Sequence, residues 1–303
     1  MAAKNDCTER RPFVLSGKLT SWQASKWTPE YLASRVFPKD QRFCARFGER
    51  KHRPGRILWE SDTVRRCATL SELLHSWKTS DTCERQSTVG NQQADDASSC
   101  VSVLACTHWF YVDYKPLFEC LPEHRLNDVD WSTLSIDRNA VDSTLWFGSR
   151  GSYTPCHYDS YGFNVHAQLH GSKRWLLFAP TDSAVLRPAR LPYEQSSVYS
   201  SVDVLSAPRC LRTTRAYCVT LHAGDVLYVP PHWWHSVQCV SHMAVSVNTW
   251  LPVAQDTQAQ LDESVVAAVL AVLLRARLIQ PTRDINPDAT QQPDAQNDAV
   301  QQD

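Results

Sequence analysis

The sequence has no excess of charge of either sign. It contains 31 Lys and Arg against 32 Asp and Glu, for a formal net charge of -1 at pH 7. A near-neutral chain offers no global electrostatic attraction to nucleic acid or to an acidic membrane surface. The most basic stretch, residues 50–56, is short and is interrupted by Pro54 and Gly55, which favours a solvated loop. We therefore expect neither a DNA partner nor a membrane partner.

Two cysteine patterns are also missing. None of the 11 cysteines belongs to a Cys-x-x-Cys pair, so the spacing of a zinc ribbon or of a thioredoxin-like redox site is excluded. Their odd number argues against a disulfide framework, and residues 1–11 lack the apolar core of a secretory signal peptide. We expect reduced thiols in a cytoplasmic protein, with entry into the nucleus left open.

Long hydrophobic runs are absent as well. The longest apolar run, Val265 to Leu274, is shorter than the roughly 20 residues that a helix needs to cross a bilayer. A chain of 303 residues that is 43% hydrophobic can instead bury one sizeable core with elaborations, or two small domains. The composition predicts a soluble globular protein.

Short strands dominate the second half of the chain. Eight strand-like runs separated by turn residues are present between Ser143 and Trp250, and this pattern suits a jelly roll, the architecture that includes cupins. These runs are Leu145 to Phe147, Tyr153 to Tyr158, Asn164 to Leu169, Arg174 to Phe178, Ala216 to Leu221, Val226 to Val229, Ser236 to Val240 and Ala244 to Thr249. The predicted fold class is mostly β, with flanking α-helices.

The segments on either side of the jelly roll define the predicted domain organisation. Residues 1–142 are expected to form an α/β extension that packs on the barrel, residues 143–252 the jelly-roll core, residues 253–279 a C-terminal helix and residues 280–303 a disordered tail. Within the extension, Trp22 and Trp27 are expected in the core. Thr28 followed by Pro29 indicates the start of a helix.

Further helices are predicted on both sides of the barrel. Leucines at helical spacing favour a helix from Thr69 to Trp77, and the polar stretch 79–99 after it is expected to be a mobile, disordered loop. The C-terminal helix, from Asp256 to Leu278, has an apolar face with Leu261, Val265 and Val269 spaced four apart. This face is either a lid on the barrel core or a homodimer contact.

One short motif carries the chemistry. His157 and Asp159 lie two apart on a predicted strand, so their side chains project from the same face. His235 follows a second strand and the stop signal Pro230-Pro231. Two imidazoles and a carboxylate form the facial triad that holds non-haem Fe(II) and leaves coordination positions open. Because 11 histidines and 32 acidic residues in 303 predict about one His-x-acid triplet by chance, a buried structural role is the alternative.

The wider sequence strengthens the metal hypothesis. Five segments together resemble the JmjC family of 2-oxoglutarate oxygenases: Trp146 to Gly148, Thr154 to Asp159, Gly171 to Trp175, Gly224 to Pro230 and Trp233 to His235. The likeness is greatest to hydroxylase-type members, both the factor-inhibiting-HIF type and a small type associated with a small heat-shock protein. Tyr158 to Gly162, Leu191 to Val198 and Val245 to Trp250 are similar to the latter type. The resemblance runs from about Phe13 to the C-terminal helix.

The resemblance implies a set of site residues and two cofactors. It assigns His157, Asp159 and His235 to Fe(II) as the catalytic metal ligands. It assigns Lys173, with a hydroxyl from Thr154, to the far carboxylate of 2-oxoglutarate, which needs a cationic partner once buried. Three further positions match cofactor-contacting residues of the family, and they are Asn164, Asn248 and Tyr111.

The resemblance also implies an activity. An Fe(II)- and 2-oxoglutarate-dependent dioxygenase that hydroxylates a protein side chain is the leading hypothesis, with the barrel supplying positioning. The main alternative is a JmjC-fold binding protein that associates with a small heat-shock protein in the stress response and has little or no catalysis. N-methyl demethylation and tRNA hydroxylation are further alternatives.

Several residues close to the motifs receive other roles. Trp233 and Trp234 either wall the metal site and exclude water or pack in the core. Cys156 alternates away from His157, which predicts a packing role for its thiol and not a metal-ligand role. Four other residues near the motifs lie outside the ligand positions and are predicted to be structural or surface residues; they are His166, His170, Arg174 and His232.

Overall fold

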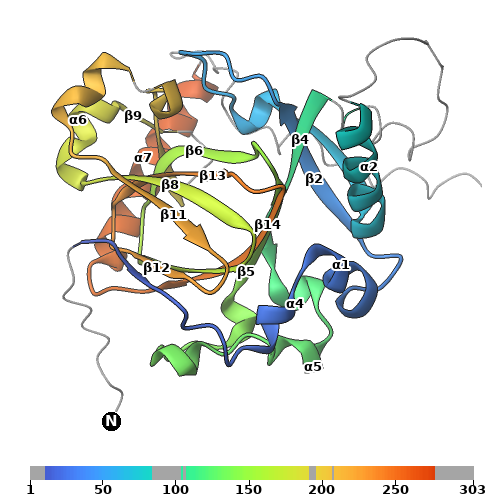
Figure 1. Cartoon of the computed structure of the whole chain (residues 1–303). Helices are drawn as coiled ribbons and strands as arrows, with labels where there is room; N and C mark the ends of the chain where they lie inside the picture. Colours follow the sequence, from blue (N-terminus) through green and yellow to red (C-terminus); the bar gives the residue numbers. More distant parts are fainter. Residues whose placement is uncertain (1–10, 84–103, 105–106, 191–195, 207, 277–303) are drawn as a thin grey trace, which may run out of the picture.

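The strands of this protein form two antiparallel sheets around a common interior (Figure 1). The computed structural model describes residues 11–83, 104, 107–190, 196–206 and 208–276. The eight-stranded sheet has the order β1-β12-β7-β14-β5-β4-β2-β3 and the six-stranded sheet the order β11-β8-β13-β6-β10-β9. The strands are β1 (Phe13–Leu15), β2 (Arg42–Glu49), β3 (Val64–Thr69), β4 (His108–Pro116), β5 (Thr144–Ser149), β6 (Tyr153–Asp159), β7 (Phe163–His170), β8 (Ser172–Phe178), β9 (Pro188–Ala189), β10 (Ser197–Ser200), β11 (Tyr217–His222), β12 (Val226–Val229), β13 (Trp234–Cys239) and β14 (Met243–Leu251).

The predicted jelly roll is confirmed. Each of the eight runs expected between Ser143 and Trp250 is a strand, and the runs are divided between the sheets: β5, β7, β12 and β14 in one, β6, β8, β11 and β13 in the other. The short strands β9 and β10 were not predicted. Strands of two and four residues contain too little alternation to stand out from a loop.

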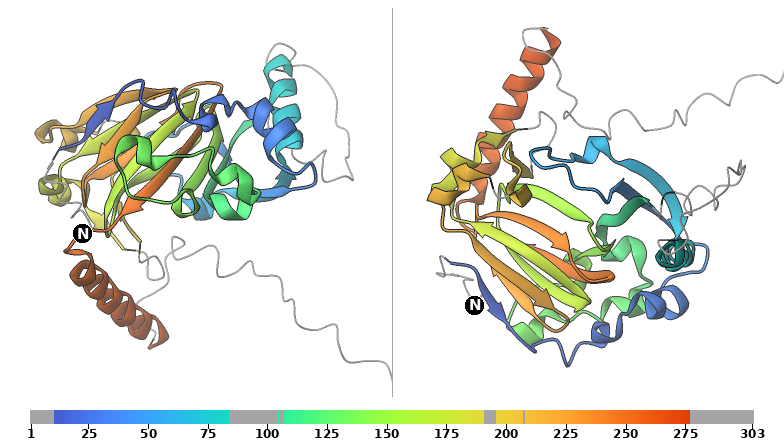
Figure 2. Two further views of the ribbon diagram at one scale, coloured as in Figure 1. Left: turned by 90° about the horizontal axis from the view of Figure 1, so that it is seen from below. Right: turned by 45° about the horizontal axis from the view of Figure 1, so that its top comes forward.

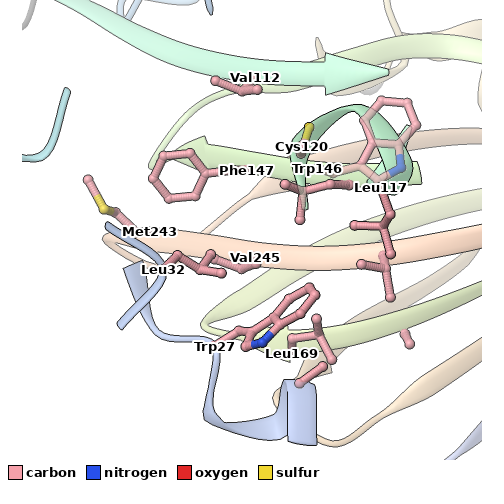
Figure 3. Close-up of a cluster of buried hydrophobic side chains, with 14 of the residues drawn as sticks. Trp27, Leu32, Val112, Leu117, Cys120, Trp146, Phe147, Leu169, Met243 and Val245 are labelled. Atoms are coloured by element: carbon pink, nitrogen blue, oxygen red, sulfur yellow. The ribbon is translucent and has the colours of Figure 1, made fainter. Parts of the chain in front are cut away.

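The N-terminal segment extends the barrel instead of only packing on it. Strand β4 pairs with β5, with Tyr111 opposite Gly148, so the sheet continues across the predicted boundary at residue 142. Trp27, which is fully buried, shares one core cluster with Leu169 and Val245 of the barrel strands (Figure 3). The N-terminal part and the barrel are therefore one cooperative unit, since they share both a sheet and a core.

The helices lie outside the sheets. They are α1 (Pro29–Tyr31), α2 (Leu70–Cys83), α4 (Leu117–Cys120), α5 (Glu123–Leu126), α6 (Ser183–Leu186) and α7 (Asp256–Arg275), and a π-helical turn, Leu32–Val36, follows α1. Thr28 caps α1 as predicted, because its hydroxyl accepts a hydrogen bond from the backbone N–H of Tyr31 at 3.1 Å.

The prediction of a disordered loop from residue 79 was wrong for its first residues. Helix α2 continues to Cys83, because Leu73 and Trp77 bury its inner face and each further helical residue adds a backbone hydrogen bond at low entropic cost. Lys78 also pairs with Glu30 at 3.0 Å. The rest of that stretch, residues 84–99, lies outside the described residues, as does the predicted tail 280–303.

Helix α7 projects away from the barrel (Figure 2). Its first residue is fixed to the barrel, because the Asp256 carboxylate accepts a hydrogen bond from the backbone N–H of Gly162 at 2.7 Å. Further along, Leu261, Val265 and Val269 are 58%, 55% and 53% exposed. The lid alternative was therefore wrong, whereas the homodimer contact stays a prediction. None of the helices in the described part of the chain combines the length and the apolar composition needed to span a membrane.

Candidate functional site

The two predicted histidine ligands face each other across a strand pair. His157 on β6 is directly opposite His235 on β13, and their ring centroids are 4.3 Å apart. Asp159 lies two residues further along β6, on the same face. One ligand atom from each of the three side chains lies within 4.8 Å of the others. The structure thus brings together residues that are far apart in the sequence.

Backbone carbonyls orient both imidazoles. The Nδ1 atom of His157 lies 2.8 Å from the carbonyl of Pro155, and that of His235 lies 2.9 Å from the carbonyl of Trp233. A carbonyl only accepts, so each Nδ1 carries the proton and each Nε2 keeps its lone pair for a metal. Burial, and then His157, lower the pKa of His235 to about 4, so this imidazole is neutral near pH 7.

The carboxylate of Asp159 is held by a hydrogen-bonded chain of side chains. Its Oδ2 atom accepts a hydrogen bond from the indole N–H of Trp250 at 2.8 Å and one from the amide of Asn164 at 3.5 Å. The amide of Asn248 donates to Asn164 at 3.0 Å and accepts from the indole of Trp146 at 2.7 Å. These contacts fix one carboxylate oxygen and leave the other directed at the imidazoles.

A β-bulge turns Thr154 into the same pocket as the metal ligands. Across the β6–β13 pair, His235 is opposite His157 but Val237 is opposite Thr154, so β6 uses three residues where β13 uses two. Residues three apart on a regular strand point to opposite faces. The extra residue of the bulge brings both side chains to the same face of the sheet. Thr154 and His157 therefore line one cavity.

Lys173 forms a cationic end to that cavity. It is 1% exposed, and its ammonium donates hydrogen bonds to the hydroxyl groups of Ser246 at 2.7 Å and Tyr111 at 3.3 Å. Burial lowers the pKa of Lys173 to about 7, although Cys239 and Asp113 act in the opposite direction. A buried ammonium whose hydrogen-bond partners in the described part of the chain are neutral hydroxyls is suited to an anionic ligand.

Tyr111 reaches Lys173 because its neighbour on β5 is a glycine. A Cβ atom at Gly148 would lie 2.6 Å from the Tyr111 ring, so any other residue would displace the phenol. A hydrogen bond with Thr154 holds its hydroxyl group, while burial raises the pKa of Tyr111. Tyr111 and Thr154 therefore present hydroxyl groups beside the ammonium of Lys173 as one unit.

All of the predicted site residues line a single pocket between the two sheets. The cavity has a volume of about 30 Å³. Its walls are Tyr111, Tyr114, Trp146, Thr154, His157, Asp159, Asn164, His166, Lys173, Trp175, His235, Val237, Asn248 and Trp250. Two imidazoles with a carboxylate at one end fit a divalent transition metal, and the ammonium at the other end fits a carboxylate of a bound acid.

Three contributors were not recognised in the sequence. Ser246 binds Lys173, Trp250 binds Asp159, and His166 lines the pocket despite its predicted structural or surface role. Strand alternation could have indicated all three. Ser246 and Trp250 flank Asn248 at two-residue spacing, and His166 follows Asn164 at the same spacing.

Core packing explains the neighbouring residues for which two roles were open. Trp233 and Trp234 belong to two separate apolar clusters of the barrel and are absent from the walls of the described pocket. Cys156 packs with Trp234 and Tyr158 on the outer side of β6, as predicted from strand alternation. Part of one further motif, residues 191–195 of the Leu191 to Val198 segment, lies outside the described residues.

Comparison with known proteins shows the family of this chain. A family model described as "Cupin-like domain" matches residues 3–255. HSPB1-associated protein 1 from Homo sapiens is 35% identical over 283 residues, which is 90% of this chain and 54% of the human protein. Jumonji C domain-containing protein 5 from Drosophila melanogaster is 31% identical over 147 residues, which is 46% of this chain and 36% of the fly protein. Lysine-specific demethylase JMJ30 from Arabidopsis thaliana is 31% identical over 148 residues, or 46% and 33% of the two chains.

The extent of these matches decides what they establish. The family model covers most of the chain, including every residue of the pocket. The chain spans about half the length of the HSPB1-associated proteins that it matches. The protein belongs to the cupin-like, JmjC-type family.

Proposed function

We propose that this protein is an Fe(II)- and 2-oxoglutarate-dependent dioxygenase that hydroxylates a side chain of a protein substrate. The observation that carries the proposal is the charge arrangement of one pocket. Two imidazoles and a carboxylate gather at one end, with ligand atoms within 4.8 Å of one another, and the buried ammonium of Lys173 closes the other end. A metal that chelates a dicarboxylic 2-oxo acid meets both requirements.

The side chains have distinct tasks in this proposal. His157, His235 and Asp159 hold iron and leave coordination positions open, while Lys173 and Thr154 hold the far carboxylate of 2-oxoglutarate. When bound, iron and 2-oxoglutarate supply the oxidising power that amino-acid side chains lack. Trp175 and Val237 of the inner apolar cluster line the pocket and limit the access of water to it.

A direct test separates binding from turnover. Purified protein would be incubated with Fe(II), 2-oxoglutarate and candidate partner proteins, and succinate formation would be measured with a His157→Ala, Asp159→Ala double variant as the control. Mass spectrometry of the partners then identifies the product. A gain of one oxygen atom with the wild-type protein alone supports hydroxylation, whereas loss of a methyl group supports demethylation. If the protein neither formed succinate nor bound iron, the result would contradict the proposal.

A binding role is the second candidate, and the name of the HSPB1-associated relatives favours it. HSPB1-associated protein 1 matches 90% of this chain, so association with a small heat-shock protein in the stress response is a coherent alternative with little or no catalysis. A chain with that role alone has no need for both a metal triad and a buried lysine. Immunoprecipitation with wild-type protein and with the double variant discriminates the roles, because a pure binding protein retains its partner after loss of the triad.

A further inference from the structure

His166 is a polar residue of the pocket that the family resemblance leaves without a role. It lies on β7, two residues after Asn164, and its side chain turns inward with that of Asn164. The residue is 4% exposed. Its Nε2 atom is fully buried and has no hydrogen-bond partner in the described part of the chain. An unpaired buried nitrogen destabilises a folded protein unless a ligand completes its hydrogen bonding.

His166 lines the same pocket as Lys173 and His235. Its ring packs edge-on against Trp175 at a centroid distance of 4.8 Å, and Trp175 stacks on His235 at 5.7 Å. Burial, followed by the nearby positive charge of Lys173, lowers the pKa of His166 well below its usual value, and His235 acts in the same direction. The imidazole is therefore neutral near pH 7 and carries one N–H group that can donate a hydrogen bond.

Counting donors shows why such a group is needed. An ammonium group has three N–H donors, and Lys173 directs two of them to Ser246 and Tyr111. One ammonium donor remains, and the hydroxyl of Thr154 adds a second, for a carboxylate that has about four lone-pair sites. A carboxylate held in this buried position needs further donors, because its unsatisfied oxygens would otherwise lose the hydrogen bonds that water supplies.

We propose that the imidazole N–H of His166 donates a hydrogen bond to the far carboxylate of 2-oxoglutarate, beside the ammonium of Lys173. The proposal rests on the proposed function, since it assumes that this acid occupies the pocket. A neutral donor is well suited to this position, because a second positive charge beside Lys173 would be repelled. His166 is then a cofactor-binding residue of this chain.

Gln168 is the competing partner for the same N–H group. Its amide N–H donates to the carbonyl of His170 at 2.7 Å, and its Oε1 atom is also buried without a hydrogen-bond partner in the described part of the chain. Gln168 lies close enough to His166 to raise its pKa, against the larger lowering by burial. If Gln168 keeps the N–H group when the acid is bound, His166 has only a structural role.

Calorimetry without turnover tests the proposal. The protein would be loaded with Mn(II) in place of iron, and the dissociation constant would be measured for 2-oxoglutarate and for 2-oxopentanoate, which lacks the far carboxylate. We expect His166→Phe to weaken 2-oxoglutarate binding about tenfold, the usual loss for a hydrogen bond to a charged group, and to leave 2-oxopentanoate unchanged. His170→Phe is the matched control, because it removes an imidazole from the same strand outside the described pocket.

The outcomes separate this proposal from the function on which it rests. Equal 2-oxoglutarate affinity in wild type and His166→Phe, or an equal loss for both acids, would overturn the role of His166. Failure of the wild-type protein to bind 2-oxoglutarate would overturn the proposed function itself. His166→Gln keeps an N–H donor and is expected to bind 2-oxoglutarate within about threefold of wild type. His166→Gln also provides a second test if the phenylalanine variant folds poorly. A tenfold loss of 2-oxoglutarate affinity in a folded His166→Gln protein would contradict the proposal.

Discussion

The two ends of the pocket differ in charge and in the way that the chain builds them. At the metal end, the two imidazoles and the carboxylate of Asp159 offer three metal ligands, and neighbouring backbone carbonyls and the indole of Trp250 hold them in place. At the other end, Lys173 is a buried cation whose described hydrogen-bond partners are neutral. The metal end is therefore suited to a cation, and the Lys173 end is suited to an anion. A metal ion with a bound dicarboxylate supplies both charges.

The ends also differ in their dependence on tertiary structure. His157 and Asp159 come from one strand and their partner His235 from the neighbouring strand. Lys173, Ser246, Tyr111 and Thr154 come from four strands, distributed over both sheets. The metal end is therefore built from two neighbouring strands of one sheet, whereas the cationic end is assembled from four strands of both sheets. Variants that disable one end at a time test whether metal binding and binding of the far carboxylate can be lost independently.

The largest effect is expected from removal of the metal end. His157→Ala and Asp159→Ala should each weaken Mn(II) or Fe(II) binding by more than about a hundredfold, because two ligands remain from a set of three. Anaerobic calorimetry measures this loss. The pocket around Lys173 should stay intact, and the melting temperature without metal should change little. Metal affinity within a few-fold of wild type would show that these residues are not the ligands.

Lys173→Met should produce opposite effects on stability and on binding. The far carboxylate loses its cation, so 2-oxoglutarate affinity should fall about a hundredfold while Mn(II) affinity is retained. Without ligand, the variant should be more stable than wild type at pH 6, because methionine removes a buried charge that forms no ion pair in the described part of the chain.

The stability difference between Lys173→Met and wild type should depend on pH. The pKa of Lys173 is lowered from 10.5 to about 7 in the folded protein, so between these values the unfolded state binds more protons and wild-type stability rises with pH. The melting-temperature advantage of the variant should be full below pH 7 and should disappear as the pH increases toward 10. A variant that is less stable than wild type at pH 6 would assign Lys173 a structural role.

Trp250→Phe tests how strongly the metal end depends on its supporting residues. The variant removes the indole N–H that holds Asp159 Oδ2 at 2.8 Å but preserves an aromatic ring. Metal affinity should fall about tenfold, the usual effect of losing a hydrogen bond that orients a ligand. The same calorimetric titration measures it. An unchanged affinity would show that Asn164 alone is sufficient to orient the carboxylate.

The smallest effect on the pocket is expected from helix α7. Val265 is 55% exposed on the apolar face that is predicted to contact a second copy. Val265→Glu should leave Mn(II) and 2-oxoglutarate affinities unchanged, because α7 projects away from the barrel. Sedimentation should show a dimer for wild type and a monomer for the variant, since a buried carboxylate disrupts an apolar contact. A wild-type monomer would refute the dimer prediction.

The sequence by itself determined the strands of the barrel and the metal motif. Alternation and turn residues are local signals, and His157 and Asp159 share a face because they are two apart on one strand. Only the tertiary structure decided which partners hold these residues. The β-bulge that turns Thr154 inward, the contact of Trp250 with Asp159 and the exposed face of α7 depend on strand register and on packing. Those features arise between segments far apart in the chain, where no periodic pattern within a single segment can specify them.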